Sequence, residues 1–424
     1  MRPLLLMAAF FAVSSCGLDD RRPGPDAIAA ASQIAADITA HRAAADLGAE
    51  VSSPALATFA RVFERVRQDY VRPVTDQALL SAARSGLREA YPDPKGVDDG
   101  KLVMAAVDGM LGSLDRYSTY LDPSDLKAMR DRIRGEFGGL GIRVKKHDEG
   151  LKIVSPIDGT PADRAALKAG DIITHADGKA LKPLSLGASV RLLRGAVGEA
   201  VRLTILRPEA APFDVTVTRD VIKVVGVRWR IEGDVGYIRV SEFTRHISRR
   251  VEDAVEMIRA RAGHDLKGFV LDLRNNPGGP FDEAVYMSDA FLESGRIVST
   301  QGRDKETSHD AEPGDVSGGK PIVVLINGGS ASASEIVAGA LQDHRRAVLM
   351  GDRSFGKGTV QRLIPLGGGD ALRLTTAIYL TPSGASVDGG IAPDVAVKSD
   401  ESREGDEQLE RALETVREMA RARS

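Results

Sequence analysis

The segment Pro321–Gln361, PIVVLINGGSASASEIVAGALQDHRRAVLMGDRSFGKGTVQ, carries the pattern that decides the fold. Ile322–Ile326 is a short apolar run rich in β-branched residues, which predicts a buried strand, and Asn327 begins the glycine turn that ends it. A helical pattern follows, and Ala347–Met350 is a second short apolar run. The segment therefore predicts a strand–helix–strand unit, and the alternation of strands and helices over 223–400 predicts an α/β core.

Three serines, Ser330, Ser332 and Ser334, fall where the predicted helix begins, and Lys357 follows the second strand in a glycine-rich loop. A serine hydroxyl needs an adjacent base to attack a carbonyl carbon, and a lysine can be that base when burial lowers its pKa. Free N–H groups at a helix N-terminus suit a developing oxyanion. Helix caps and a surface lysine explain the same residues, so chemistry alone leaves both interpretations open.

The runs GGSASASEIVAGAL and FGKGTVQ resemble the nucleophile and base segments of the C-terminal processing peptidases, also called tail-specific proteases. The resemblance extends over nearly the whole of the chain expected to be exported. It implies an α/β peptidase core of the crotonase-like kind. It also implies Ser332 as the nucleophile, Lys357 as the general base and Gln361 as a catalytic residue that hydrogen-bonds Lys357 and holds it in place.

The turn RNNPGG follows the predicted strand Gly268–Leu273. In the resembling family this turn supplies part of the oxyanion hole, which implies a pair of donors here, the N–H groups of Gly278 and Ala333. The alternative is a simple tight turn. Three nearby charged residues are interpreted as a structural ion pair or cap, with orientation of the site as the alternative: Asp272, Arg274 and Glu335.

Residues 135–222 resemble a PDZ-like domain inserted before the peptidase core. The run FGGLGI resembles the carboxylate-binding loop of PDZ domains, and PADRAALKAGDII resembles their helix–turn–strand signature. Such a loop aims backbone N–H groups at a terminal carboxylate while an extended peptide adds to a sheet edge. The expected peptide-binding residues are Gly138, Gly139, Leu140, Gly141 and Ile142.

The beginning of the chain, residues 1–15, has the charged start and short apolar run of a signal peptide. The run ends at Val13-Ser14-Ser15-Cys16, which resembles a bacterial lipobox, and Cys16 is the only cysteine. We therefore expect a protein of the bacterial envelope, lipid-anchored in the periplasm through Cys16 and a linker over 16–54. The alternative is a plain cleaved signal with an incidental cysteine.

The remaining segments complete the expected domain organisation. An N-terminal helical segment is expected over 55–134, where DGMLGSLDRYSTYLDP is interpreted as a structural join between domains. Residues 28–42 could form an alanine-rich helix, and the polar run Asp304–Gly319 predicts a surface loop. A charged C-terminal helix over 401–424 is expected to cap the core or to mediate homo-oligomerisation.

The composition fits a soluble globular protein of two or three domains, with 424 residues, 42% apolar and 28% charged residues and a formal net charge of −3. This charge gives no argument for a nucleic-acid partner. No HExxH motif, zinc-type cysteine spacing or Walker loop is present, so no metal and no cofactor are expected. A Ser-His-Asp triad built from the seven histidines has no supporting motif.

The sequence thus predicts a serine endopeptidase with a Ser-Lys dyad that cleaves envelope proteins. Its PDZ-like domain would recognise substrate C-termini or gate the site, and an activating adaptor is a further candidate partner. Two alternatives stay open: a non-catalytic envelope adaptor, whose signature would be loss of the site residues, and an acyl-CoA enzyme on a related core.

Overall fold

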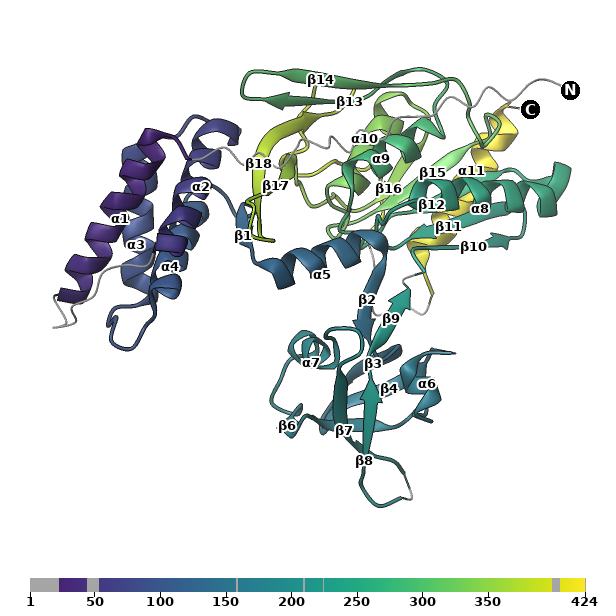
Figure 1. Ribbon diagram of the computed structural model, residues 1–424. Coiled ribbons are helices and arrows are strands. Elements are labelled where there is room, and N and C mark those ends of the chain that lie inside the picture. The colour runs from purple at the N-terminus through teal and green to yellow at the C-terminus, as the bar shows by residue number, and fades with distance from the viewer. Residues whose placement is uncertain are drawn as a thin grey trace, which may run out of the picture.

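The computed structural model describes residues 23–43, 53–157, 159–208, 210–223, 225–398 and 405–423. The expected signal peptide and Cys16 lie outside these residues. Figure 1 shows three parts: a helical bundle, a larger α/β part, and a small sheet module joined to the rest through one pair of strands. None of the described helices has the length and apolar character needed to cross a bilayer.

The first part is a four-helix bundle with an apolar interior. Residues 25–43 lie in the segment assigned to a linker over 16–54, in which an alanine-rich helix was expected over 28–42. They form the first helix of the bundle, and Ile34 is fully buried in the bundle core. Two of the helices approach each other closely at Gly86 and Gly109. A side chain would not fit there, because a Cβ on Gly86 would lie only 2.4 Å from the Cα of Gly109. The helices are α1 (Pro25–Ala43), α2 (Ser53–Asp69), α3 (Asp76–Ala90) and α4 (Asp99–Gly112).

A short strand and one helix lead from the bundle into the sheet module. The Asp122 carboxylate caps this helix by accepting hydrogen bonds from the N–H groups of Ser124 (2.7 Å) and Asp125 (2.8 Å). Gly135 ends the helix in the left-handed conformation, with φ 73°. The two elements are β1 (Thr119–Leu121) and α5 (Pro123–Arg134).

The sheet module is inserted between α5 and the rest of the chain. It leaves and returns through an antiparallel pair, β2 (Glu136–Gly139) and β9 (Asp220–Lys223). Its own sheet has the order β3-β4-β5-β7-β8, with β6 paired to β5, so that β3 lies at an edge. The elements are β3 (Ile142–His147), β4 (Gly150–Pro156), α6 (Pro161–Arg164), β5 (Ile172–Ala176), β6 (Lys179–Ala180), α7 (Leu186–Leu193), β7 (Ala200–Leu206) and β8 (Phe213–Thr218).

The α/β part is built on a six-stranded sheet with the order β10-β11-β12-β15-β16-β19. Its strands pair in parallel, except that β10 is antiparallel to β11. This confirms the predicted α/β alternation. The strands are β10 (Val227–Glu232), β11 (Val235–Val240), β12 (Gly268–Asp272), β15 (Ile322–Ile326), β16 (Val348–Gly351) and β19 (Val395–Ala396).

Helices cover both faces of this sheet, and the alternation along each strand decides which residue packs on which face. In β15, Val324 packs into the cluster formed with α8, α9 and α10, while Val323 and Leu325 pack against α11. Figure 1 shows α11, in yellow, crossing behind the sheet. The helices are α8 (Ile247–Ala262), the 3₁₀ turn η1 (Gly263–Asp265), α9 (Phe281–Asp289), α10 (Ala333–Asp343) and α11 (Glu407–Arg423).

A second sheet joins the bundle to the α/β part. Its order is β1-β18-β13-β14, and β17 also pairs with β18. The segment Glu306–Ala311, expected to lie in a surface loop, forms an edge strand, because backbone pairing with its neighbour needs no apolar side chains. The strands are β13 (Gly295–Gly302), β14 (Glu306–Ala311), β17 (Thr359–Pro365) and β18 (Ala371–Leu380).

Candidate active site

Ser332 lies at the sharp turn between β15 and α10, as the N-cap of the helix. Its φ of 56° is unusual for a residue with a side chain, and such strain concentrates at functional sites. The two neighbouring serines are fully buried: Ser330 donates to the Leu273 carbonyl (2.9 Å) and Ser334 to the Asn276 carbonyl (3.0 Å). Ser332 alone of the three lines a cavity.

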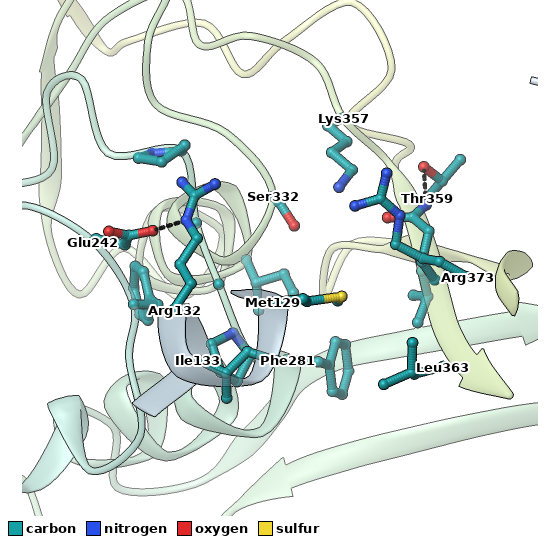
Figure 2. A pocket seen from close by; sticks show the side chains of 18 of the residues that line it. Met129, Arg132, Ile133, Glu242, Phe281, Ser332, Lys357, Thr359, Leu363 and Arg373 are labelled. Atoms are coloured by element: carbon teal, nitrogen blue, oxygen red, sulfur yellow. Dashed lines mark hydrogen bonds and ion pairs between the residues drawn. The ribbon is translucent and has the colours of Figure 1, made fainter. Parts of the chain in front are cut away.

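Lys357 faces the same cavity from the glycine-rich loop after β16. Figure 2 shows the Lys357 amine and the Ser332 hydroxyl directed into one space. Burial lowers the pKa of the Lys357 amine from its usual value, and the positive charge of Arg373 lowers it further. The amine forms no ion pair with any described residue and lies 4.8 Å from the ring centroid of Tyr117. The arrangement favours a neutral lysine beside a serine hydroxyl.

The Glu335 side chain joins the serine turn to the lysine loop. Its Oε2 accepts hydrogen bonds from the N–H groups of Ser332 (2.7 Å) and Lys357 (3.0 Å), and its Oε1 accepts from Gly356 N–H (2.7 Å) and the Ser354 hydroxyl (2.6 Å). Glu335 is fully buried. This residue, interpreted from the sequence as a cap or an orienting group, therefore does both.

Tyr379 on β18 forms a second link between the two segments. Its hydroxyl donates to the backbone carbonyls of Lys357 and Ser332. Burial raises the pKa of the Tyr379 hydroxyl well above its usual value, so it remains a donor. The positions of Ser332 and Lys357 are thus held at both their N–H and their C=O groups.

The expected oxyanion hole is present only in part. The Gly278 N–H donates to the Oδ1 of Asn276 (2.9 Å), which closes a tight side-chain turn and makes this N–H unavailable to a substrate. The role expected for Gly278 as an oxyanion donor therefore needs a rearranged turn and stays a prediction. The N–H groups of Ala333 and Gly279 make no hydrogen bond with described residues. Ala333 is the first residue of α10, where the helix dipole favours negative charge.

Gly278 nevertheless has to be a glycine. Its φ is 91°, and a Cβ there would lie 2.6 Å from the Ala331 carbonyl oxygen and 2.9 Å from the Ala333 nitrogen. The glycine turn therefore packs directly on the nucleophile turn.

Gln361 lines the cavity but does not hold the lysine. Its amide donates to the hydroxyls of Thr359 (2.9 Å) and Thr375 (3.3 Å), and it forms no hydrogen bond with Lys357. The amide is instead bound to a threonine of its own strand and to Thr375, its pairing partner on β18.

The cavity has a volume of about 430 Å³ and combines one apolar wall with the polar groups described above. Figure 2 shows Met129 and Ile133 of α5, together with Phe281 and Leu363, around the serine and lysine. Such a wall can accept the apolar side chain of a peptide.

A second cavity of about 980 Å³ shares Met129, Arg132, Glu242 and Arg373 with the first. It continues to Gly138 and other residues of the sheet module. The second cavity therefore borders the active-site cavity on one side and the sheet module on the other.

The sequence analysis missed two residues of this site, Tyr117 and Arg373. Arg373 lines both cavities, and its Nε donates to the Tyr117 carbonyl oxygen (3.1 Å). The segment DRYSTY was interpreted as a structural join, and no local pattern marks Arg373 on β18. Only the pairing of β1 with β18 brings them to the lysine.

The expected carboxylate loop connects β2 to β3. Gly138 and Gly139 pair with β9, and Leu140 is buried. Gly141 has φ 75°, and a Cβ there would lie 2.3 Å from the Cβ of Thr160. Ile142 begins β3, whose outer edge carries no strand among the described residues. An open edge next to a glycine loop can accept an extended peptide.

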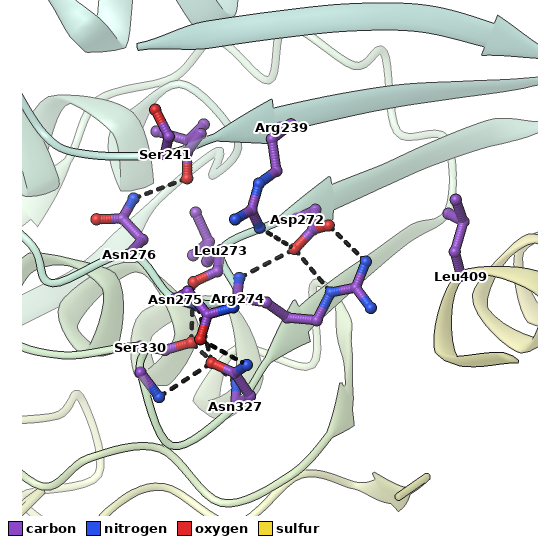
Figure 3. A network of polar contacts seen from close by, with 12 residues as sticks. Arg239, Ser241, Asp272, Leu273, Arg274, Asn275, Asn276, Asn327, Ser330 and Leu409 are labelled. Carbon is purple, nitrogen blue, oxygen red and sulfur yellow. Dashed lines mark hydrogen bonds and ion pairs between the residues drawn. The ribbon is translucent and has the colours of Figure 1, made fainter. Parts of the chain in front are cut away.

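The ion pairs at Asp272 support the glycine turn from the far side (Figure 3). The nearly fully buried Asp272 carboxylate accepts from the guanidinium groups of Arg239 (2.6 Å) and Arg274 (2.7 Å), and Arg274 also bonds Asp406 just before α11 (2.7 Å). Asn275 N–H donates to the Asn327 side chain (2.8 Å), which ties the glycine turn to the nucleophile turn. None of these six residues lines the active-site cavity, so the structural interpretation of Asp272 and Arg274 agrees with the geometry.

No group of three or more His, Cys, Asp or Glu side chains within the described ranges is arranged to hold a metal ion. The chemistry visible at the site is that of Ser332, Lys357 and the backbone around them.

Comparison with known proteins gives the family. The model of peptidase family S41 matches residues 234–397, and the PDZ domain model matches residues 138–218. A carboxy-terminal-processing protease of Bartonella bacilliformis is 49% identical over 348 residues, covering 81% of this chain and 75% of the relative. A probable CtpA-like serine protease of Staphylococcus aureus is 39% identical over 334 residues, covering 76% of this chain and 66% of the relative.

A solved structure, the photosystem II D1 C-terminal processing protease, is also similar. It aligns with a TM-score of 0.52 and 29% identity over 82% of this chain and 94% of its own. The chain therefore belongs to peptidase family S41, among the serine-type carboxy-terminal-processing proteases.

Proposed function

We propose that this protein is a serine endopeptidase that uses a Ser332–Lys357 dyad on proteins of the bacterial envelope. The observation that carries the proposal is the pair itself: a cavity-facing serine and a partly buried lysine with a lowered pKa line one cavity, and the same carboxylate binds both backbones.

In the proposed reaction, the Ser332 Oγ attacks the carbonyl carbon of the scissile peptide bond. Neutral Lys357 takes the hydroxyl proton and gives it to the departing amine as the C–N bond breaks. The Ala333 N–H stabilises the oxyanion, and the N–H of Gly279 or of a rearranged Gly278 is the second donor. Water, deprotonated by the same lysine, then attacks the acyl carbon, the bond to Ser332 Oγ breaks, and the lysine returns the proton to the serine oxygen.

The PDZ-like domain is proposed to bind substrate C-termini at the loop over 138–142 and along the open edge of β3. The cavity that runs from Gly138 to Arg373 supports this role, because it leads from the module toward Ser332. An anchor at Cys16, a periplasmic location, an activating adaptor and homo-oligomerisation remain proposals from the sequence.

The test is hydrolysis of an end-blocked peptide by the wild type, Ser332→Ala, Lys357→Ala and the double variant. Each single variant should lose nearly all activity and the double variant should be no worse, because the two residues act as one unit. Ser334→Ala is the matched control, since this serine is in the same motif but bonds a backbone carbonyl. It should cost about 1 kcal/mol of stability and leave the folded enzyme active. Substantial activity of folded Ser332→Ala would overturn the proposal.

A further inference from the structure

Arg373 is a half-buried cation that faces the active-site cavity without an anionic partner. Its Nε–H donates to the Tyr117 carbonyl oxygen (3.1 Å), while its two terminal nitrogens make no hydrogen bond with any described residue. Figure 2 shows its guanidinium beside the Lys357 amine, facing the same space as the Ser332 hydroxyl.

Arg373 differs in this respect from Arg132, the other arginine that lines the cavity. Arg132, across the cavity on α5, is paired with Glu242, and Glu242 is the only carboxylate among the residues that line this cavity. Asp115 approaches Arg373 closely enough to act on its charge but forms no ion pair with it. The cavity therefore has an excess of positive charge next to the nucleophile.

A charged guanidinium at this position is destabilised by loss of water unless an anion pairs with it. Removal from water penalises the charged form, and this penalty is reduced when an anion pairs with the charge. Burial indeed lowers the pKa of Arg373. The two terminal nitrogens present a planar fork that matches the two oxygens of a carboxylate, which a lysine cannot reproduce.

We propose that Arg373 forms a carboxylate-binding subsite within the active-site cavity, beside Ser332. The ligand is a carboxylate of the bound peptide, either an acidic side chain near the scissile bond or the terminal carboxylate of a short tail. The inference rests on the proposed role of Ser332 and Lys357, and it makes Arg373 a residue that determines specificity.

The subsite has a consequence for the lysine. Four charged groups face Lys357: Arg373 on β18, Arg116 before β1, Glu335 on α10 and Asp115 before β1. The two arginines lower its pKa, and the two carboxylates raise it. A substrate carboxylate bound at Arg373 offsets part of the arginine charge, so the lysine becomes neutral at higher pH when the substrate is acidic than when it is not.

The first experiment compares pairs of end-blocked peptides that differ only by Glu or Gln at successive positions around the cleaved bond. The wild type should prefer Glu by about tenfold in kcat/KM at one position, in line with hydrogen bonds to charged groups. Arg373→Gln should bring that ratio close to one, and Arg373→Lys should give an intermediate ratio. Arg116→Gln is the matched control: it removes an exposed arginine that also faces the lysine but does not line the cavity.

A second arm distinguishes the two sources of the carboxylate. Short neutral peptides with a free or an amidated C-terminus are compared in the same variants. A preference for the free end that is lost in Arg373→Gln assigns the subsite to the terminal carboxylate, whereas one that persists belongs to the PDZ-like domain.

Two further readouts separate this inference from the dyad. Peptide binding to Ser332→Ala, measured by fluorescence anisotropy, should show the same dependence on Arg373 without any catalysis. The apparent pKa of kcat, which reports the enzyme–substrate complex, should be higher with the Glu peptide than with the Gln peptide in the wild type and equal for both in Arg373→Gln, which an arginine that binds no substrate carboxylate would not cause. Equal rates and equal binding for Glu and Gln at every position, together with no dependence on a free end at Arg373, would overturn the subsite. If activity survived in Ser332→Ala while binding still depended on Arg373, the dyad alone would fail.

Discussion

The Glu335 carboxylate binds the backbone N–H of Lys357 at 3.0 Å, and the same oxygen binds the N–H of Ser332 at 2.7 Å. A single buried side chain thereby sets the separation between two segments that come from different loops. This relationship makes the geometry of the proposed dyad depend on the charge of one residue that does not touch the substrate.

Glu335→Gln should therefore impair both stability and activity. The Glu335 carboxylate accepts four hydrogen bonds, from three N–H groups and one hydroxyl. The amide of glutamine has only one accepting oxygen, so its nitrogen would face at least one of these donors. The unsatisfied donors should lower the free energy of unfolding by on the order of 2 kcal/mol. Loss of position should lower kcat by about tenfold or more. Thermal unfolding and peptide hydrolysis measure the two effects, and full kcat in folded Glu335→Gln would contradict this role.

The activity should rise with pH through a pKa that lies below the usual value for lysine. Burial and Arg373 lower the pKa of Lys357, and only the neutral amine accepts the serine proton, so the active fraction grows as pH increases through that value. A pH profile of kcat/KM on a neutral peptide measures it. Lys357→Arg should be inactive at every pH, because guanidinium stays charged. A flat profile with a chemical step shown to limit the rate would count against a lysine base.

Tyr379→Phe should lower kcat more than it changes KM. The variant keeps the buried ring and removes the hydroxyl that donates to the carbonyls of Lys357 and Ser332. The single hydroxyl hydrogen is shared between the two carbonyls, so its loss should reduce kcat by about fivefold to tenfold, which corresponds to about 1 kcal/mol in total. Tyr286→Phe is the control, because Tyr286 is an exposed tyrosine on α9. Equal kinetics for both variants would leave Tyr379 with a packing role only.

Gly141→Ala should weaken binding of peptides with a free C-terminus. The alanine would be strained at φ 75° and its Cβ would meet Thr160, which reshapes the loop expected to hold the carboxylate. Gly159→Ala is the control that introduces similar backbone strain without a steric clash, since Gly159 has φ 73° and open space around it. Titration of free and amidated peptides measures the effect. If both alanine variants bind both peptides like the wild type, the loop does not recognise substrate tails.

Cys16→Ser should release the protein from the membrane into the soluble envelope fraction or block its processing. The basis is the lipobox-like run Val13-Ser14-Ser15-Cys16. Fractionation followed by mass spectrometry of the N-terminal peptide makes the measurement. A wild-type protein that is wholly soluble and carries no lipid on Cys16 would remove the lipoprotein proposal.

The sequence alone determined the parts of this protein whose signals are local. The apolar run of β15, the glycine turn and the serine cap of α10 are neighbours in the chain, so their strand–turn–helix geometry follows from short-range preferences. The placement of Lys357 after the next parallel strand follows because adjacent parallel strands end at the same edge of a sheet.

The tertiary structure decided what depends on contacts between distant segments. Arg373 and Tyr117 are 256 residues apart in the sequence and share a hydrogen bond. They reach Lys357 through the pairing of β1 with β18. The engagement of Gly278 by Asn276 and the turning of Gln361 toward Thr375 depend on which donors and acceptors folding leaves nearby. Hydrogen bonds and charges act over a few ångströms in space whatever the separation in sequence. Residue patterns therefore singled out Ser332 and Lys357 as candidates, but only the folded chain defined what surrounds them.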